Sequence, residues 1–272
     1  MTLSVSTAPE AASPALISLT SFGAAEVLRH GQLWFARLSQ AAGADGVEVR
    51  EELLQSAARE LPELAAWARE ATHNGAMELV YSCPQPLYAQ GGALALATLQ
   101  HAIDASHRLG AGWLKMSIGG FGAQSQGLQG FDAIQQALAG TGITLLIEND
   151  QTVDAGTLQA LERFFAGADA AGLPLPMTFD MGNWAYQGEC ALQAAQRLAQ
   201  RVGYVHAKGV QRLPAKWVAV PLAESQLPWR ATLRALPAGV PRAIEYPLIG
   251  DDLEAVTRRE LQILRNATAL LA

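Results

Sequence analysis

The chain has few cysteines, few basic residues and no long apolar runs, and each shortage excludes a class of protein. Its two cysteines, Cys83 and Cys190, lack the spacings of a disulfide framework or a zinc site. Nineteen Lys and Arg against 25 Asp and Glu give a net charge of −6, which argues against a nucleic-acid partner. No apolar run is long enough to cross a membrane, and the N-terminus lacks the pattern of a secretion signal. We therefore expect a cytoplasmic protein with no membrane or nucleic-acid partner.

Half of the residues are hydrophobic, and they are arranged as short apolar runs that alternate with longer amphipathic stretches. Eight such alternations predict an α/β fold, a single (β/α)₈ barrel. An open doubly wound sheet would need a glycine-rich phosphate loop after its first strand, and LTSFGAAE is not one. Residues 1–14 are predicted to be a flexible tail and residues 15–272 the barrel. The apolar runs are Leu16–Phe22, Gly46–Val49, Met77–Ser82, Trp113–Ile118, Ile143–Glu148, Met177–Asp180, Gly203–His206 and Ala243–Tyr246.

Four of the predicted strands end in a charged or metal-binding side chain. TLLIEND reaches Glu148, PMTFDMGN reaches Asp180, GYVHAKG reaches His206 and RAIEYPL reaches Glu245. A single carboxylate or histidine in such a place is more often a helix cap or an ion-pair partner. Four on the fifth to the eighth strands converge on one half of the barrel mouth, where a divalent cation would offset the repulsion among three carboxylates. The sequence therefore predicts a site for one divalent metal ion.

The chemistry of these ligands narrows the choice of metal. Three carboxylates and one imidazole, without a thiolate, favour Mn²⁺, Mg²⁺ or Co²⁺, with Zn²⁺ as an alternative. Four protein ligands also leave coordination positions for two substrate oxygens, which a catalytic metal needs.

These motifs resemble the xylose isomerase-like TIM-barrel superfamily, which includes sugar phosphate isomerases and epimerases and AP endonuclease family 2. The resemblance extends from GVEVRE in the second strand to RAIEYPL in the eighth. It implies that Glu148 and Glu245 both bind the metal and exchange the substrate proton. It also makes Arg212 a substrate contact and places Asp154 at a second acidic position. Asn183 stands where the epimerases usually carry a histidine hydrogen-bonded to substrate oxygen; as a substrate-binding residue it can donate a hydrogen bond, but it cannot transfer a proton at neutral pH.

Further candidates for substrate binding lie at the ends of other strands. Lys115 either anchors a substrate carboxylate or phosphate or pairs with a barrel acid such as Glu48 or Glu148. Glu48 either binds a substrate hydroxyl or pairs with Lys115 or Arg50. Lys208 follows the metal histidine, and Trp184 lies in a predicted mouth loop, where an aromatic ring either stacks on a sugar or packs within the loop.

The main functional prediction is a metal-dependent isomerase or epimerase of a small sugar, sugar phosphate or sugar acid. It would remove a proton next to a metal-bound carbonyl and pass through an enediolate. The alternative is a metal-dependent lyase, a decarboxylase or dehydratase of a keto sugar acid. A DNA-repair endonuclease would need more metal-binding histidines than the five present, and a non-catalytic barrel would not need four ligands. Barrels of this family often pair through helices, so the sequence leaves the oligomeric state open between a monomer and a homo-oligomer.

Overall fold

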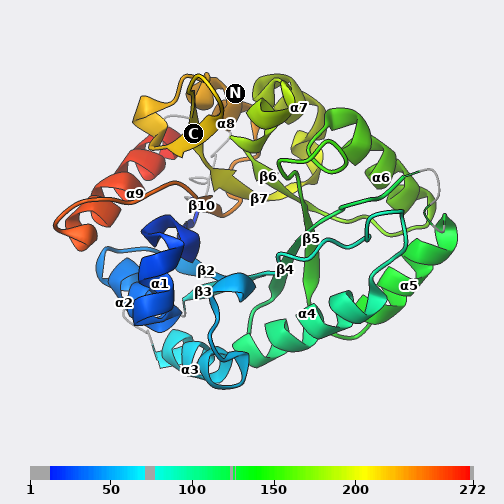
Figure 1. The fold of residues 1–272 in the computed structure, drawn as a ribbon, viewed down its shortest axis with the longest axis horizontal. Coiled ribbons are helices and arrows are strands. Elements are labelled where there is room, and N and C mark those ends of the chain that lie inside the picture. Colours follow the sequence, from blue (N-terminus) through cyan, green and yellow to red (C-terminus); the bar gives the residue numbers. More distant parts are fainter. Residues whose placement is uncertain (1–12, 71–76, 123–124, 126, 270–272) are drawn as a thin grey trace, which may run out of the picture.

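The computed structural model describes residues 13–70, 77–122, 125 and 127–269, and its centre is a closed barrel of eight parallel strands (Figure 1). The strands are ordered β1-β10-β7-β6-β5-β4-β3-β2 around the barrel. Their bounds are β1 Ala15–Ser18, β2 Gly46–Arg50, β3 Glu78–Ser82, β4 Trp113–Ser117, β5 Thr144–Glu148, β6 Met177–Asp180, β7 Val202–Ala207 and β10 Arg242–Ile244. The predicted (β/α)₈ barrel is confirmed.

Helices surround the strands and cover their outer faces (Figure 1). They are α1 Ala24–His30, α2 Gln32–Ala41, α3 Ala57–Glu70, α4 Leu96–Leu109, α5 Leu128–Leu138, α6 Leu158–Ala170, α7 Ala191–Leu198, α8 Trp229–Ala235 and α9 Leu253–Ala269. Alternate strand residues such as Ile17, Leu114 and Phe179 point outward and join the large hydrophobic core beneath these helices. None of the described helices combines the length and the apolar character needed to cross a membrane.

The inside of the barrel has an apolar layer and, above it, a polar one. Leu146 and Tyr204 belong to a small buried apolar cluster inside the barrel, and Trp113 packs against it. Because side chains alternate along a strand, the residue two positions later faces the same way. Glu148 therefore follows Leu146 toward the mouth, and His206 follows Tyr204. The short strands thus bury an apolar floor and place charged groups directly over it.

The two ends of the barrel sequence meet at the seam between β1 and β10. The two strands pair in parallel, with Ile17 opposite Ile244. Just before β1, the Pro14 carbonyl accepts a hydrogen bond of 2.9 Å from the Arg242 backbone N–H. The flexible tail predicted for residues 1–14 lies outside the described residues except for Ser13 and Pro14, and both of these contact the segment around β10.

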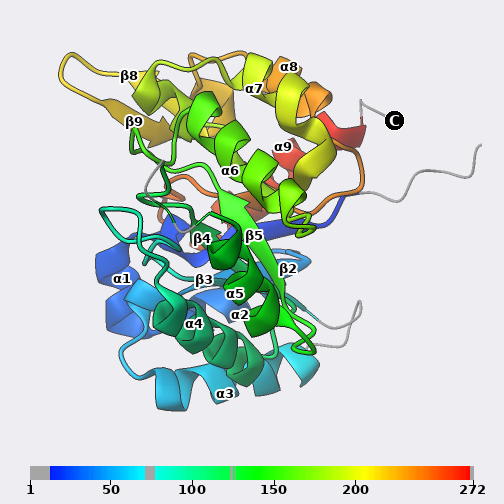
Figure 2. The same ribbon diagram turned by 90° about the vertical axis from the view of Figure 1, so that its right-hand side faces the viewer.

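An antiparallel hairpin follows β7, before the last barrel strand. It consists of β8 Gly209–Arg212 and β9 Trp217–Val220. It projects from the body of the molecule (Figure 2), and Ala219 on β9 reaches the cavity at the mouth of the barrel. This hairpin was not predicted from the sequence.

Candidate active site

Four side chains with metal-binding chemistry converge at the C-terminal ends of neighbouring strands. Glu148 ends β5, Asp180 ends β6, His206 lies near the end of β7, and Glu245 follows β10. Asp180 and His206 lie directly opposite each other in the β6–β7 register. One donor atom of each residue lies within 4.8 Å of the others. The structure therefore brings together the four predicted ligands in a cluster that could hold a metal ion.

The orientation of His206 favours metal binding through its Nδ1 atom. Its Nε2 lies 2.7 Å from Glu48 Oε2, and both side chains are fully buried. In the neutral ring, which a metal requires, the Glu48 carboxylate fits as the acceptor of an Nε2–H proton, and the Nδ1 lone pair then faces the cluster. Nδ1 lies 2.9 Å from Glu148 Oε1 and 3.1 Å from Glu245 Oε2. Within the described residues no hydrogen bond satisfies Nδ1, so a cation among these atoms fits the donor set.

Asp180 is held rigidly by its neighbours. Its Oδ1 accepts hydrogen bonds from the backbone N–H groups of Gly182 and Asn183, which leaves Oδ2 to face the cluster. The fully buried Asn149 side chain accepts a hydrogen bond from the Asp180 N–H and donates one to its carbonyl oxygen. The backbone and the carboxylate of this ligand are thus both fixed before any ion binds.

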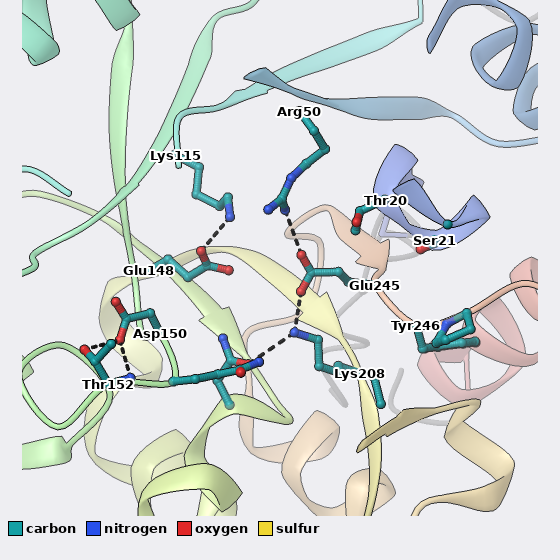
Figure 3. A pocket seen from close by; sticks show the side chains of 15 residues that line it. Thr20, Ser21, Arg50, Lys115, Glu148, Asp150, Thr152, Lys208, Glu245 and Tyr246 are labelled. Carbon is teal, nitrogen blue, oxygen red and sulfur yellow. Dashed lines mark hydrogen bonds and ion pairs between the residues drawn. The ribbon is translucent and has the colours of Figure 1, made fainter. Parts of the chain in front are cut away.

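Three buried or nearly buried cations surround the cluster (Figure 3). Lys115 Nζ lies 2.5 Å from Glu148 Oε2, so the structure shows the ion pair that the sequence left as one alternative. Arg50 Nη1 donates to Glu48 Oε1 and to Glu245 Oε1, at 2.9 and 2.8 Å. Lys208 Nζ lies 2.6 Å from both Asp180 Oδ2 and Glu245 Oε2. Each ligand carboxylate therefore has a cationic partner behind or beside it.

These charges shift the pKa values of the cluster. Burial alone would raise the pKa of Glu148 and Glu245, but Lys115 and His206 lower it at Glu148, and His206 and Lys208 lower it well below its usual range at Glu245. Burial raises the pKa of Asp180 despite the opposing effect of Lys208. Burial would lower the pKa of His206, but the surrounding glutamates raise it well above 6.5. Both glutamates are therefore ionised at neutral pH, the form that binds a metal or accepts a proton.

A cavity of about 490 Å³ opens above the cluster. Lys115, Asn183 and Lys208 line it together with the two glutamates, Arg50 and the hydroxyl residues Thr20, Ser21 and Thr152. The Asn183 side chain donates to the Asn149 carbonyl, and its oxygen accepts hydrogen bonds from Lys208 and Gln151. Asn183 thus places an amide at the edge of the cavity, where its oxygen accepts a hydrogen bond from Lys208.

Four residues singled out in the sequence lie away from the walls of this cavity. Glu48 is buried beneath it, against His206 and Arg50. Trp184 is fully buried, with its ring 5.4 Å from that of Phe179, which is the loop packing considered as its alternative role. Arg212 lies on the projecting hairpin with its guanidinium over Trp217, and Asp154 is exposed. The structure thus gives Glu48 a place behind the metal cluster, and it does not bring Trp184, Arg212 or Asp154 to the cavity wall.

Asn149 had no role predicted from the sequence, and Arg50 was expected only as a partner of Glu48. Asn149 follows Glu148 directly and clamps the Asp180 backbone. A polar residue at the end of an otherwise apolar strand was the available signal. Arg50 ends β2, two residues after Glu48, so the period of two along a strand could have placed it near the mouth.

The family model described as "Xylose isomerase-like TIM barrel" matches residues 36–267. The chain belongs to this family, which confirms the resemblance seen in its motifs. No curated protein matches the chain by sequence.

Several solved structures share the fold at low sequence identity. A structure of L-ribulose 3-epimerase has a TM-score of 0.70 and 13% identity, with 95% of each chain covered. A probable 3-DHS dehydratase, AsbF, involved in petrobactin synthesis in Bacillus anthracis, has a TM-score of 0.68 and 14% identity, covering 92% of this chain and 98% of that one. A fusion of a xylose isomerase-like TIM barrel with a 4-hydroxyphenylpyruvate dioxygenase has a TM-score of 0.69 and 15% identity. It covers 93% of this chain, which spans 42% of that longer protein.

Proposed function

We propose that the protein is a divalent-metal-dependent isomerase or epimerase of a small sugar, sugar phosphate or sugar acid. The observation that carries the proposal is the convergence of three carboxylates on His206 Nδ1, a buried atom without a hydrogen bond in the described structure. Similar structures, which include an L-ribulose 3-epimerase, support the choice of reaction.

Glu148, Asp180, His206 and Glu245 would hold the ion, with Mn²⁺, Mg²⁺ or Co²⁺ preferred by the ligand set and Zn²⁺ as an alternative. A bound divalent ion would polarise a substrate carbonyl and so acidify the adjacent C–H bond. The cavity above the cluster leaves an open side for the substrate, as a catalytic site requires.

The two glutamates supply the acid and base. Glu148 ends β5 and Glu245 follows β10, with β6 and β7 between them in the barrel. A substrate carbon between the two carboxylates presents a different face to each. One glutamate would remove the proton to give an enediolate, and the other would deliver a proton to the opposite face, which inverts the centre. If the same carboxylate returned the proton to the neighbouring carbon, the result would be aldose–ketose isomerisation.

The second candidate is a lyase of a keto sugar acid, a decarboxylase or dehydratase that starts with the same proton abstraction. The observation that favours it is the set of cations on the cavity wall, Arg50, Lys115 and Lys208, which suits a substrate carboxylate. The structural similarity to a probable 3-DHS dehydratase supports it as well. Released CO₂ or a dehydrated product from a panel of keto sugar acids would identify this reaction.

Solvent exchange tests the leading candidate. Conversion of a ketose panel in D₂O is expected to place deuterium at the reacting carbon, detected by NMR and mass spectrometry. Glu148→Gln and Glu245→Gln are each expected to lose about two to four orders of magnitude in rate, the usual contribution of a general acid or base. Glutamine retains a carbonyl oxygen for the metal and cannot accept the proton.

Full activity in either variant, or product formed without solvent deuterium, would contradict two-base exchange. Glu52→Gln is a matched control, because Glu52 contacts the outer side of Arg50 and is 34% exposed. This control should retain the wild-type rate within about twofold, as is usual for exposed side chains that contribute little.

A further inference from the structure

The cavity has two chemically different halves. Strands β5, β6, β7 and β10 contribute the metal-binding cluster, and β2 and β4 contribute Arg50 and Lys115. Figure 3 shows these two cations side by side, both pointing toward the two glutamates. The β2 and β4 side of the cavity therefore presents two cations, in addition to Lys208, which follows β7.

Arg50 and Lys115 are both largely removed from solvent and close enough to repel each other. The Lys115 side chain is 4% exposed and that of Arg50 is 15% exposed. The Glu48 carboxylate offsets this repulsion, because its Oε1 lies 2.9 Å from Arg50 Nη1 and 3.9 Å from Lys115 Nζ.

Both cations retain donor capacity toward the cavity. Arg50 uses Nη1 for Glu48 and Glu245 and Nε for Glu52, and no contact within the described part of the chain uses its Nη2. Lys115 Nζ makes one close contact, with Glu148, and lies 3.9 Å from Glu48. An ammonium group has three donors, so at least one N–H of Lys115 can serve a ligand.

A count of the charges around the cluster indicates the sign of the charge that the substrate should carry. Four carboxylates (Glu48, Glu148, Asp180 and Glu245) face three cations (Arg50, Lys115 and Lys208), which leaves a net charge of −1 with a neutral imidazole. A divalent ion changes this to +1. The remaining nearby acids, Glu52 and Asp150, lie at the partly exposed rim, where water screens them. A loaded site with one excess positive charge favours a substrate with one negative charge.

We infer that the substrate is a sugar acid whose carboxylate sits against Arg50 and Lys115, while its carbonyl end faces the metal cluster. This inference rests on the proposed function and narrows its substrate class. A guanidinium group and an ammonium group together can provide a planar carboxylate with two or more charge-assisted hydrogen bonds. A phosphate monoester, with a charge of about −1.5 to −2 at neutral pH, would carry more negative charge than the single excess positive charge of the metal-loaded site.

Matched pairs of compounds test this inference by binding. D-fructose and D-fructuronate differ at the carbon farthest from the ketone, which is a primary alcohol in the sugar and a carboxylate in the acid. D-tagatose and D-tagaturonate provide a second pair with the other configuration at one carbon, and D-fructose 6-phosphate provides the phosphate. Each is titrated into Mn²⁺-loaded protein by isothermal titration calorimetry at low salt.

We expect the better of the two acids to bind about tenfold to a hundredfold more tightly than its sugar, the usual range for hydrogen bonds to a charged group. Lys115→Gln and Arg50→Gln should each reduce this ratio toward one and change the affinity for the sugar less than about threefold. Lys216→Gln, on the exposed tip of the hairpin, is the control and should preserve the ratio. Each variant is first titrated with Mn²⁺ to verify that it binds the ion.

Three results would overturn the inference: sugars that bind as tightly as their acids, a phosphate that binds more tightly than both, or no binding of either acid. If Lys115→Gln or Arg50→Gln fails to bind Mn²⁺, the test is the wild-type ratio of acid affinity to sugar affinity. This ratio should decrease as salt is added, because salt screens the attraction between the carboxylate and the two cations. A different measurement, deuterium exchange, would contradict the proposed function. Tight binding of an acid with no deuterium exchange would support the sugar-acid substrate and contradict the isomerase or epimerase reaction. Deuterium exchange on neutral sugars alone would support that reaction and contradict the sugar-acid substrate.

Discussion

Replacing Glu48 with glutamine tests whether the metal cluster depends on a residue that does not bind the metal. Glu48 is fully buried, and its carboxylate contacts His206 Nε2 at 2.7 Å and Arg50 Nη1 at 2.9 Å. Glutamine has nearly the same shape but no charge. The His206 N–H would then face a neutral oxygen, and the net charge of the cluster would rise by one unit, so both effects oppose cation binding. We expect the metal affinity to fall about tenfold to a hundredfold, the usual cost of losing such a supporting contact.

The measurement is the Mn²⁺ dissociation constant from competition with a chelating dye, with circular dichroism to verify that the variant is folded. Glu52→Gln provides the matched control, because Glu52 also contacts Arg50, at 2.9 Å, but is 34% exposed. Its affinity should stay within about twofold of wild type, as expected for an exposed ion pair. A folded Glu48→Gln protein that binds Mn²⁺ as tightly as the control would refute the reasoning, because the orientation of His206 would then be set by other contacts.

Two further predictions concern the same ion. Purified protein should contain about one divalent ion per chain, chelation should abolish activity, and the Asp180→Ala, His206→Ala double variant should bind less than about a tenth of an equivalent at the same metal concentration. Metal analysis by mass spectrometry checks this, and a full equivalent in the double variant would show that the ligands are other residues. Metal binding should also release about one proton at neutral pH, because the surrounding glutamates raise the pKa of His206 well above 6.5 and the ion needs the neutral ring. The affinity should then rise about tenfold per pH unit below that pKa. Calorimetry in buffers of different ionisation enthalpy measures the release, and uptake or no exchange would contradict it.

The strands and the four clustered side chains could be predicted because their environment is so uniform. A strand with helices on one face and a filled barrel on the other is apolar along its length, so a charged residue at its end stands out. Glu148, Asp180 and His206 are such residues, and the strands observed around them end within one residue of the predicted positions.

Side chains outside the regular strands could not be placed in this way. Trp184 was considered for substrate stacking because it lies in a predicted mouth loop, and Arg212 was expected at the substrate because the family resemblance implies it. In the structure Trp184 lies in a short 3₁₀ helix, Asn183–Gln187, that turns it into the core, and Arg212 lies on the unpredicted hairpin. The direction of a side chain in such segments depends on tertiary packing, which has no period in the sequence. The contact of Glu48 with His206 was missed for a related reason, because 158 residues separate the two partners.

The seam between β1 and β10 links metal binding to the integrity of the whole barrel. Glu245 lies three residues after Arg242, whose backbone N–H is held by the Pro14 carbonyl at the other end of the barrel sequence. An ion shared by Glu245 and residues of β5, β6 and β7 would join the last strand to the middle of the chain. Because the ligands lie together only in the closed barrel, the ion would add its binding free energy to the folded state alone. Ion binding and attachment of the terminal strand would then be thermodynamically linked, so removal of the ion should make that seam easier to open.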